Sequence, residues 1–297
     1  MRSGTVAVVG RANAGKSTLI NVLVGEKVSI VSPKPQTTRD RILGILTTDD
    51  YQIVFEDTPG IYKASSLLNE RMQKSVKTAA KDVDLVLFVI DGHNGIKDED
   101  LTNLKSFLKG DVKVVVAVSK IDIMPKENLP LVLAKFADVE GITDIVPISA
   151  RKGKNIKDLL DTLAKNLPEQ EAIYGDDIVS DKSVKFMVAE IMREKLLLKY
   201  DKEIPHGTAV VVNEFYRRES GTYEVNLDIV CEKENHKAIL IGKGGKALKE
   251  VSSFARENME KFLGAKVFLT VYVKVKENWR DKPNLLQEYG YGEEEFN

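Results

Sequence analysis

The stretch from Gly10 to Ser17, which reads GRANAGKS, constrains this chain more than any other part of the sequence. It fits the pattern G-x-x-x-x-G-K-[ST], in which two glycines let the backbone wrap closely around phosphate oxygens. Lys16 supplies a positive charge to the phosphates, and the hydroxyl of Ser17 is suited to Mg²⁺. The sequence therefore predicts a phosphate-binding loop whose remaining contacts come from Arg11, Ala12, Asn13, Ala14, Gly15 and Thr18.

The residues on either side of this loop have the pattern that such a loop requires. Residues 6–9 form a short apolar run typical of a buried parallel strand, and residues 18–23 continue with the apolar spacing of a helix. A chance match to the motif is the alternative, and it would not come with the order strand, glycine-rich loop, helix. The order favours a nucleotide-binding loop.

Two further segments carry groups suited to a nucleotide and its metal ion. Residues 28–40 have no apolar period and read as a loop, in which Thr37 and Thr38 offer hydroxyl and N–H groups. Residues 51–56 read as a strand that runs into Asp57-Thr58-Pro59-Gly60, which puts a carboxylate at the carboxyl end of a strand. An ordinary solvated loop and a simple turn are the alternatives. In this order, the segments favour Mg²⁺ held by Ser17, Thr38 and Asp57, with the N–H of Gly60 directed at the γ-phosphate.

The rest of the first half alternates between strands and helices. Such alternation predicts an α/β domain with a mostly parallel sheet and helices on both faces. We expect strands at 41–47, 51–56, 85–90, 112–118 and 144–148, and helices at 67–83, 98–108, 129–137 and 156–167.

Two loops that follow buried strands contain groups expected of a guanine site. Ser119-Lys120-Ile121-Asp122 places a carboxylate where it can accept hydrogen bonds from N1–H and the exocyclic amine of guanine. The aliphatic part of Lys120 can lie across the base or ribose. Ser149-Ala150 offers the N–H of Ala150 to guanine O6. Each short motif is weak alone, but their order along the chain is informative.

The bulk composition excludes several classes of protein. The 297 residues suffice for two domains, and 43% hydrophobic with 30% charged residues is ordinary for a globular protein. A formal net charge of −1 means that any nucleic-acid site must be local. The single cysteine, Cys231, excludes an intrachain disulfide and reads as a small core residue. The first strand begins within a few residues of Met1, so we expect no signal peptide, and no apolar run reaches the roughly 20 residues of a membrane span.

The second half has a different order of elements. Residues 166–181 lack an apolar period and read as a linker. A helix at 184–198, strands at 208–215 and 223–231, helices at 235–241 and about 248–262, and a strand at 267–275 follow. The two later helices flank Gly242-Lys243-Gly244-Gly245. This order of elements is similar to that of bacterial-type KH domains, which are α+β.

The glycine-rich loop between these helices is the predicted RNA contact. In KH domains a Gly-x-x-Gly loop clamps the backbone of a short single strand. The resemblance implies contacts from Ile241, Gly242, Lys243, Gly244, Gly245 and Lys246. Residues 182–276 hold about 18 basic and about 13 acidic side chains, a modest local excess that favours phosphate. A purely structural helix–turn–helix is the alternative, since a Gly-x-x-Gly alone says little.

The motifs GRANAGKS, PQTTR, DTPG, SKID and SAR together resemble those of the Era-type GTPases, and the resemblance covers nearly the whole chain. It implies a GTPase domain at 1–168, a linker at 169–181, a KH domain at 182–276 and a C-terminal tail at 277–297, ending in an acidic, disordered stretch. The resemblance implies binding and hydrolysis of GTP to GDP with Mg²⁺, where Lys16, Thr38 and Gly60 act on the phosphates. It also implies K⁺ near Asn13.

The resemblance further implies partners and a location. We expect binding to the 3′ region of small-subunit ribosomal RNA and to pre-subunit particles, a role in assembling the small subunit, and a monomer. We expect the protein in the cytoplasm, with peripheral association at the inner face of the cell membrane.

Two residues depart from the patterns of related GTPases. Ser119 stands where these families usually have Asn, and we expect its shorter hydroxyl to bond locally but to lose the amide's reach between the base and the phosphate-binding loop, which would lower nucleotide affinity. Ile61 stands where Ras-like GTPases have a water-orienting Gln, as is usual in the Era group, so the water-positioning group is unidentified. These departures support an alternative, an RNA-binding protein with a regulatory nucleotide domain of little hydrolytic activity. A tRNA-modification GTPase is a further alternative, but such proteins lack a C-terminal Gly-x-x-Gly unit.

Overall fold

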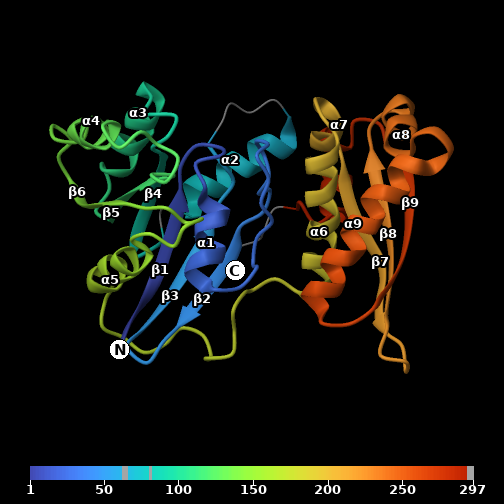
Figure 1. Cartoon of the computed structure of the whole chain (residues 1–297), viewed down its shortest axis with the longest axis horizontal. Helices are drawn as coiled ribbons and strands as arrows, with labels where there is room; N and C mark the ends of the chain where they lie inside the picture. The colour runs from blue at the N-terminus through green and yellow to red at the C-terminus, as the bar shows by residue number, and fades with distance from the viewer. Residues whose placement is uncertain (62–65, 80–81, 293–297) are drawn as a thin grey trace. The chain divides into compact units, whose positions relative to one another are not determined.

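The computed structural model describes residues 1–61, 66–79 and 82–292. The described chain divides into two compact units, which are drawn with their elements in Figure 1. The first contains residues 1–31, 38–61, 72–79 and 82–181, and the second contains residues 32–37, 66–71 and 182–292. Each unit has its own sheet and its own hydrophobic core.

The first unit is built on a six-stranded sheet with the order β2-β3-β1-β4-β5-β6. All neighbouring strands are parallel except β2 and β3, which form an antiparallel pair joined at Asp49-Asp50. The central strands read as continuous apolar runs because both of their faces are buried. The mostly parallel α/β fold expected from the sequence is confirmed, with strands β1 (Arg2–Val9), β2 (Ile42–Thr47), β3 (Tyr51–Asp57), β4 (Leu85–Asp91), β5 (Lys113–Ser119) and β6 (Ile142–Pro147).

Helices cover both faces of this sheet. Apolar side chains of α1 (Lys16–Val24) and α5 (Ile156–Asn166) pack on one face. Those of α2 (Leu67–Ala79), α3 (Asp98–Phe107) and α4 (Asn128–Ala134) pack on the other. Helix α4 ends three residues earlier than expected, because residues 135–137 bond to the carbonyls three positions back and tighten out of the α-helix.

Residues 169–181, predicted as a linker, run along the free edge of β2 and also contact a side chain of β3. The N–H of Ile45 donates to the carbonyl oxygen of Val179 at 2.9 Å, and the N–H of Leu43 donates to the Asp181 carboxylate at 2.8 Å. The Gln52 side chain accepts from the N–H groups of residues 173 and 174 at 2.7 and 2.9 Å. The segment therefore covers a sheet edge that would otherwise expose unpaired backbone groups.

The second unit contains a three-stranded sheet, β7-β8-β9, in which β7 and β8 are antiparallel and β8 and β9 are parallel. One face of the sheet is covered by the apolar sides of α6, α8 and α9, as Figure 1 shows for α6 and α9. Cys231 is a free, fully buried thiol of this core, as expected. The elements are α6 (Val184–Lys199), α7 (Glu203–His206), β7 (Ala209–Arg217), β8 (Tyr223–Cys231), α8 (Glu234–Ile241), α9 (Lys246–Leu263) and β9 (Val267–Val275).

The C-terminal segment is anchored to this unit by a buried tryptophan and by an ion pair between Arg280 and Glu232. Trp279, in a short 3₁₀ helix (η2, Trp279–Asp281), is fully buried and donates its indole N–H to the carbonyl oxygen of Gly207 at 3.0 Å. Tyr289 and Tyr291, which follow the end of α10 (Pro283–Glu288), pack against its ring. The expected acidic end of the chain, residues 293–297, lies outside the described residues. No helix in the described part of the chain is long and apolar enough to cross a membrane.

Candidate functional site

The loop from Gly10 to Ser17 joins β1 to α1 at the carboxyl end of the sheet, where ligands of open α/β sheets bind. Gly10 has φ +146°, and a Cβ there would lie 2.3 Å from the carbonyl oxygen of Val89. Gly15 has φ +101° and forms the N-cap of α1. These two positions accept only glycine, which is why the loop can turn this tightly. Lys16 is buried and donates to the carbonyl oxygens of Gly10 and Arg11 at 3.0 and 3.1 Å.

Burial dominates the electrostatics of this loop. It lowers the pKa of Lys16 to about 8, although the charge of Asp57 opposes the shift. Burial also raises the pKa of Asp57, against the effect of nearby hydroxyls and of Lys16. Both shifts disfavour charge in a site with little access to water. A bound anion would favour the charged form of Lys16, and a bound cation would favour the charged form of Asp57.

Three oxygen-bearing side chains lie together beside Lys16. The hydroxyl oxygens of Ser17 and Thr38 are 2.9 Å apart, and the Thr38 hydroxyl donates to Asp57 Oδ2 at 3.4 Å. Asp57 is fully buried at the end of β3, and its Oδ1 atom has no hydrogen-bond partner. Oxygen donors with one unsatisfied carboxylate oxygen fit a hard divalent cation. The residues present thus suit Mg²⁺.

The segment after Asp57 packs directly on the phosphate-binding loop. The Thr58 hydroxyl donates to the carbonyl oxygen of Val8 at 2.8 Å, and Pro59 is buried. A Cβ on Gly60 would lie 2.7 Å from Cα of Ala12, so only glycine fits. The N–H of Ile61 donates to the carbonyl oxygen of Gly10 at 3.2 Å, while its side chain packs into the core between the sheet and α2.

Thr37 lies in the stretch 32–37, which groups with the second unit. Its hydroxyl lies 2.8 Å from that of Ser32 and 2.7 Å from the carbonyl oxygen of Lys34. As predicted, no described residue of 28–40 is in a helix or strand.

The predicted base loop follows β5 and contacts the phosphate-binding loop. The Ser119 hydroxyl is buried and lies 2.6 Å from the carbonyl oxygen of Ala14 and 2.9 Å from that of Ile90. The part of the expectation that concerns reach toward the phosphate-binding loop is therefore wrong. Although β4 separates β1 from β5 in the sheet, one hydroxyl lies within hydrogen-bond distance both of Ile90 in β4 and of Ala14 in the loop after β1. One hydroxyl proton can serve only one of the two carbonyls at a time.

The predicted base-reading carboxylate is held in place by the second loop. The Ser149 hydroxyl donates to Asp122 Oδ1 at 2.7 Å and accepts from the N–H of Lys152 at 3.2 Å. The N–H of Ile121 donates to the carbonyl oxygen of Ile148 at 3.3 Å, next to Ser149 and Ala150. The two motifs, 27 residues apart between Asp122 and Ser149, thus form one surface, with Asp122 exposed to accept a ligand.

Two acidic residues at this site carried no motif. Asp91 ends β4 and pairs with Lys120, whose Nζ atom lies 2.7 Å from Asp91 Oδ2. Asp100 in α3 is buried and pairs with Arg11 at 2.6 Å. Asp91 could have been found from its place directly after a buried strand, at the edge where the phosphate-binding and base loops lie. Asp100 lies within α3, and no sequence motif marks it as part of a nucleotide site.

The glycine-rich loop of the second unit joins α8 to α9. Gly242 has φ +72°, and a Cβ there would lie 2.7 Å from the Cβ of Ala247. Gly244 and Gly245 also have left-handed backbones, but nothing lies within 4 Å of an added Cβ at either. Lys243 and Lys246 are exposed beside the N-terminus of α9, which attracts anions. Gly242 thus serves packing, whereas the next two glycines keep the loop open to a ligand.

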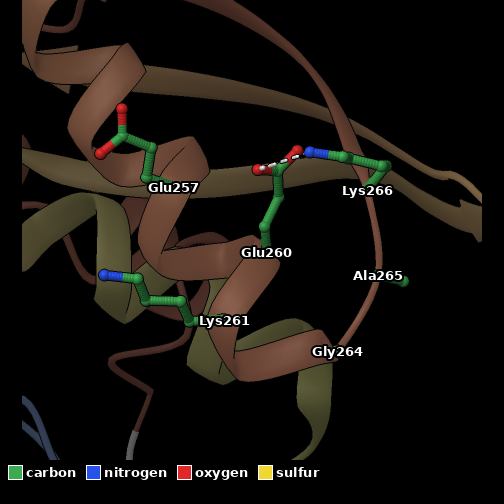
Figure 2. A pocket seen from close by; sticks show the side chains of 6 residues that line it. All are labelled: Glu257, Glu260, Lys261, Gly264, Ala265 and Lys266. Atoms are coloured by element: carbon green, nitrogen blue, oxygen red, sulfur yellow. Dashed lines mark ion pairs between the residues drawn. The ribbon is translucent and has the colours of Figure 1, made fainter.

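A pocket at the other end of α9 contains none of the predicted site residues. Figure 2 shows its six lining side chains, with Glu260 directed toward Lys266. Glu260 pairs with Lys266 at 3.9 Å and with Arg256 at 2.9 Å, and it accepts from the N–H of Val267 at 3.2 Å. Its charge is therefore already compensated. Lys261 and Lys266 also line this pocket, but it contains no part of the phosphate-binding loop, of the base loops or of the Gly-x-x-Gly loop.

Two family models match the chain. The model described as 50S ribosome-binding GTPase matches residues 5–120, and the model described as KH domain matches residues 203–280. GTPase Era of Clostridium kluyveri is 46% identical over 291 residues, covering 98% of this chain and 99% of the relative. GTPase Era of Clostridium botulinum is 47% identical over 290 residues, covering 98% of each chain.

Solved structures agree over the whole chain. The crystal structure of Era in complex with MgGDPNP and nucleotides 1506–1542 of 16S ribosomal RNA has a TM-score of 0.94 at 38% identity, covering 98% of this chain and 99% of that chain. The structure of an Aquifex aeolicus Era variant bound to GDP.AlF4⁻ has a TM-score of 0.93 at 39% identity, covering 98% and 100%.

The fold and the site define a class of protein, a P-loop GTPase that carries a C-terminal KH domain. The relatives narrow this class further. The chain belongs to the Era family of GTPases. The alternative of an RNA-binding protein with little hydrolytic activity is not favoured, since the relatives that match nearly the full chain are GTPases.

Proposed function

We propose that this GTPase binds the 3′ region of small-subunit ribosomal RNA through its KH domain and acts in assembling the small subunit on pre-subunit particles. One observation carries the proposal most directly. A relative that matches 98% of this chain was crystallised with nucleotides 1506–1542 of 16S ribosomal RNA. The open loop at Gly244 and Gly245, flanked by two exposed lysines, is compatible with a single strand whose backbone approaches closely.

In the nucleotide site, each predicted residue receives a role from its position. Lys16 and the N–H groups of residues 10–18 would bind the phosphates, with Thr37, Thr38 and Gly60 at the γ-phosphate. Asp122, oriented by Ser149, would read guanine, and the N–H of Ala150 would bind its O6. Lys120 would cover the base. The packing of Gly60 on Ala12 supports a γ-phosphate sensor at this point, because a ligand there contacts both loops.

Ser17, Thr38 and Asp57 would hold Mg²⁺, which when bound neutralises charge on the phosphate oxygens. The unpartnered Oδ1 of Asp57 and the crystallised MgGDPNP complex of the relative support this assignment. Asn13 would help to hold K⁺. Its left-handed backbone, with φ +64°, turns the loop at this point, and its carbonyl oxygen accepts from Lys120 at 2.7 Å.

The proposal extends to location and assembly. The protein would act as a monomer in the cytoplasm, where ribosomal subunits are assembled, with a fraction bound peripherally to the inner face of the cell membrane. Fractionation of cells into soluble and membrane material, followed by washing the membranes with salt, tests this part. Recovery of all protein from the soluble fraction would contradict the proposed membrane association.

Binding of a 3′ small-subunit RNA fragment to the full chain tests the central proposal. We expect the variant Lys243→Asp with Gly244→Asp to lose RNA binding and to keep GTP binding. The matched control is Lys261→Asp with Gly264→Asp. Gly264 has φ +62° against +60° for Gly244, and neither has a neighbour within 4 Å of an added Cβ, so charge and strain are alike. Equal RNA affinity of the two double variants would overturn the proposal.

A further inference from the structure

The aspartate that ends β4 occupies a particular place in the sheet. The strand order β1-β4-β5 puts the end of β4 between the phosphate-binding loop after β1 and the base loop after β5. Asp91 is the last residue of β4 and is 5% exposed. A carboxylate so placed has to be compensated by neighbouring donors. Its donors come from one of these two loops and from its own turn.

Asp91 is held on both of its oxygens. Asp91 Oδ2 accepts from Lys120 Nζ at 2.7 Å and from Asn94 Nδ2 at 2.7 Å, and Oδ1 accepts from the N–H of Asn94 at 3.1 Å. Burial alone would raise the pKa of Asp91, but these donors outweigh it and keep its pKa below the usual value. The carboxylate is therefore ionised at neutral pH and fixed in orientation.

Lys120 connects the Asp91 carboxylate to the phosphate-binding loop. Its Nζ atom also donates to the carbonyl oxygen of Asn13 at 2.7 Å, so one ammonium group joins the end of β4 to the phosphate-binding loop. Lys120 has φ +62°, a conformation that side-chain-bearing residues rarely adopt and that surrounding contacts must hold. Without the carboxylate, the ammonium would keep only one carbonyl acceptor and solvent.

We propose that Asp91, oriented by Asn94, is a positioning residue that holds Lys120 of the base loop against the phosphate-binding loop and thereby slows release of guanine nucleotide. Asp91 acts through Lys120 and contacts no predicted catalytic group. Its removal therefore weakens nucleotide binding more than it slows the chemical step. The effect falls on dissociation, because the encounter with the nucleotide does not depend on this pair.

The test measures release of a fluorescent GDP analogue and steady-state GTP hydrolysis by the full chain. We expect Asp91→Asn to release GDP about tenfold faster, the scale of one lost charge-assisted hydrogen bond, and to raise KM for GTP more than it lowers kcat. Asn94→Ala, at an exposed residue, changes release in the same direction by less. Asp111→Asn, at an exposed aspartate before β5, serves as the control and leaves release unchanged.

A double-mutant cycle separates positioning from a general loss of stability. In a Lys120→Met background, Asp91→Asn adds little to the release rate, because the group that it positions is gone. Additive effects of the two substitutions would overturn the proposal. So would wild-type GDP release in both Asp91→Asn and Asn94→Ala. If Asp91→Asn does not fold, Asn94→Ala alone decides, since its site is on the surface.

Discussion

The Ser119 hydroxyl lies 2.6 Å from the carbonyl oxygen of Ala14, and this contact ties the base loop to the phosphate-binding loop. Ser119 is 4% exposed, so water cannot replace the hydroxyl if it is removed. A buried carbonyl that loses its only side-chain donor costs about 1–3 kcal/mol. Ser119 thus links the base loop to the phosphate-binding loop through one hydrogen bond.

Ser119→Ala should therefore weaken nucleotide binding. We expect GDP affinity to fall by about 1 kcal/mol, at the low end of the cost of an unsatisfied buried group. Calorimetric titration of GDP into both proteins measures the change. Ser106→Ala, at an exposed hydroxyl in α3 that bonds only within its own helix, is the control. Unchanged GDP affinity in Ser119→Ala would show that the contact with Ala14 is incidental.

Asp122→Asn should change the base preference of the site. The amide replaces two acceptors with one donor and one acceptor, which matches xanthine better than guanine. Ser149 still donates to the remaining oxygen, so the loop keeps its position. We expect GTP affinity to fall by about 2–3 kcal/mol, the cost of mismatched polar groups, while affinity for xanthosine triphosphate rises. A variant that keeps the wild-type preference for GTP would refute the assignment of Asp122.

The lowered pKa of Lys16, about 8, predicts opposite effects of pH on binding and on stability. Phosphates bind the charged lysine, so affinity for GDP should fall as pH rises through 8. In the nucleotide-free protein the folded state binds fewer protons than the unfolded state between pH 8 and 10.5, so stability should rise across that range. Urea unfolding of wild type and Lys16→Met between pH 7 and 10 isolates this contribution. A difference between the two proteins that does not change with pH would contradict it.

Hydrolysis should depend on a monovalent cation and not on Ile61. The Ile61 side chain packs into the core beside α2 and cannot orient water, so Ile61→Ala should retain hydrolysis. K⁺ held near Asn13 would supply positive charge at the phosphates, so we expect faster turnover in K⁺ than in Na⁺. Asn13→Ala should remove the difference. Equal rates of the wild type in the two salts at matched ionic strength would dispose of the K⁺ site.

Much of this architecture could be predicted from local sequence patterns. The central strands β4 and β5 are continuous apolar runs because both faces are buried, and β9 was predicted with the bounds that the structure gives. The predicted order of elements in the second unit is also correct, except that it lacks the four-residue helix α7 (Glu203–His206), which is too short to show an apolar period. The motifs at Lys16, Asp57 and Asp122 stand out in the sequence because the chemistry that they predict requires particular residue types at fixed spacings.

The features that the sequence could not predict depend on contacts between residues whose spacing in the sequence shows no helix or strand period. Residues 169–181 bind the edge of β2 through main-chain and polar contacts, which leave no apolar pattern in the sequence. Trp279 is buried by tyrosines at irregular spacings, 289 and 291. The link between Asp91 and Lys120 joins residues 29 positions apart and depends on strand order, which a strand pattern alone does not determine.

The proposed function places a nucleotide site and an RNA site in one molecule, and we expect binding at the two sites to be coupled. Coupling between two ligands is reciprocal, so whatever GTP does to RNA affinity, RNA must do to GTP affinity by the same factor. The most direct measurement titrates a 3′ small-subunit RNA fragment into the GDP-bound, GTP-analogue-bound and empty forms of the full chain. The account predicts tighter RNA binding in the GTP-analogue form, with an equal gain in analogue affinity when RNA is present. Identical RNA affinity in all three forms would contradict it, and would leave a GTPase and an RNA-binding domain that are only tethered.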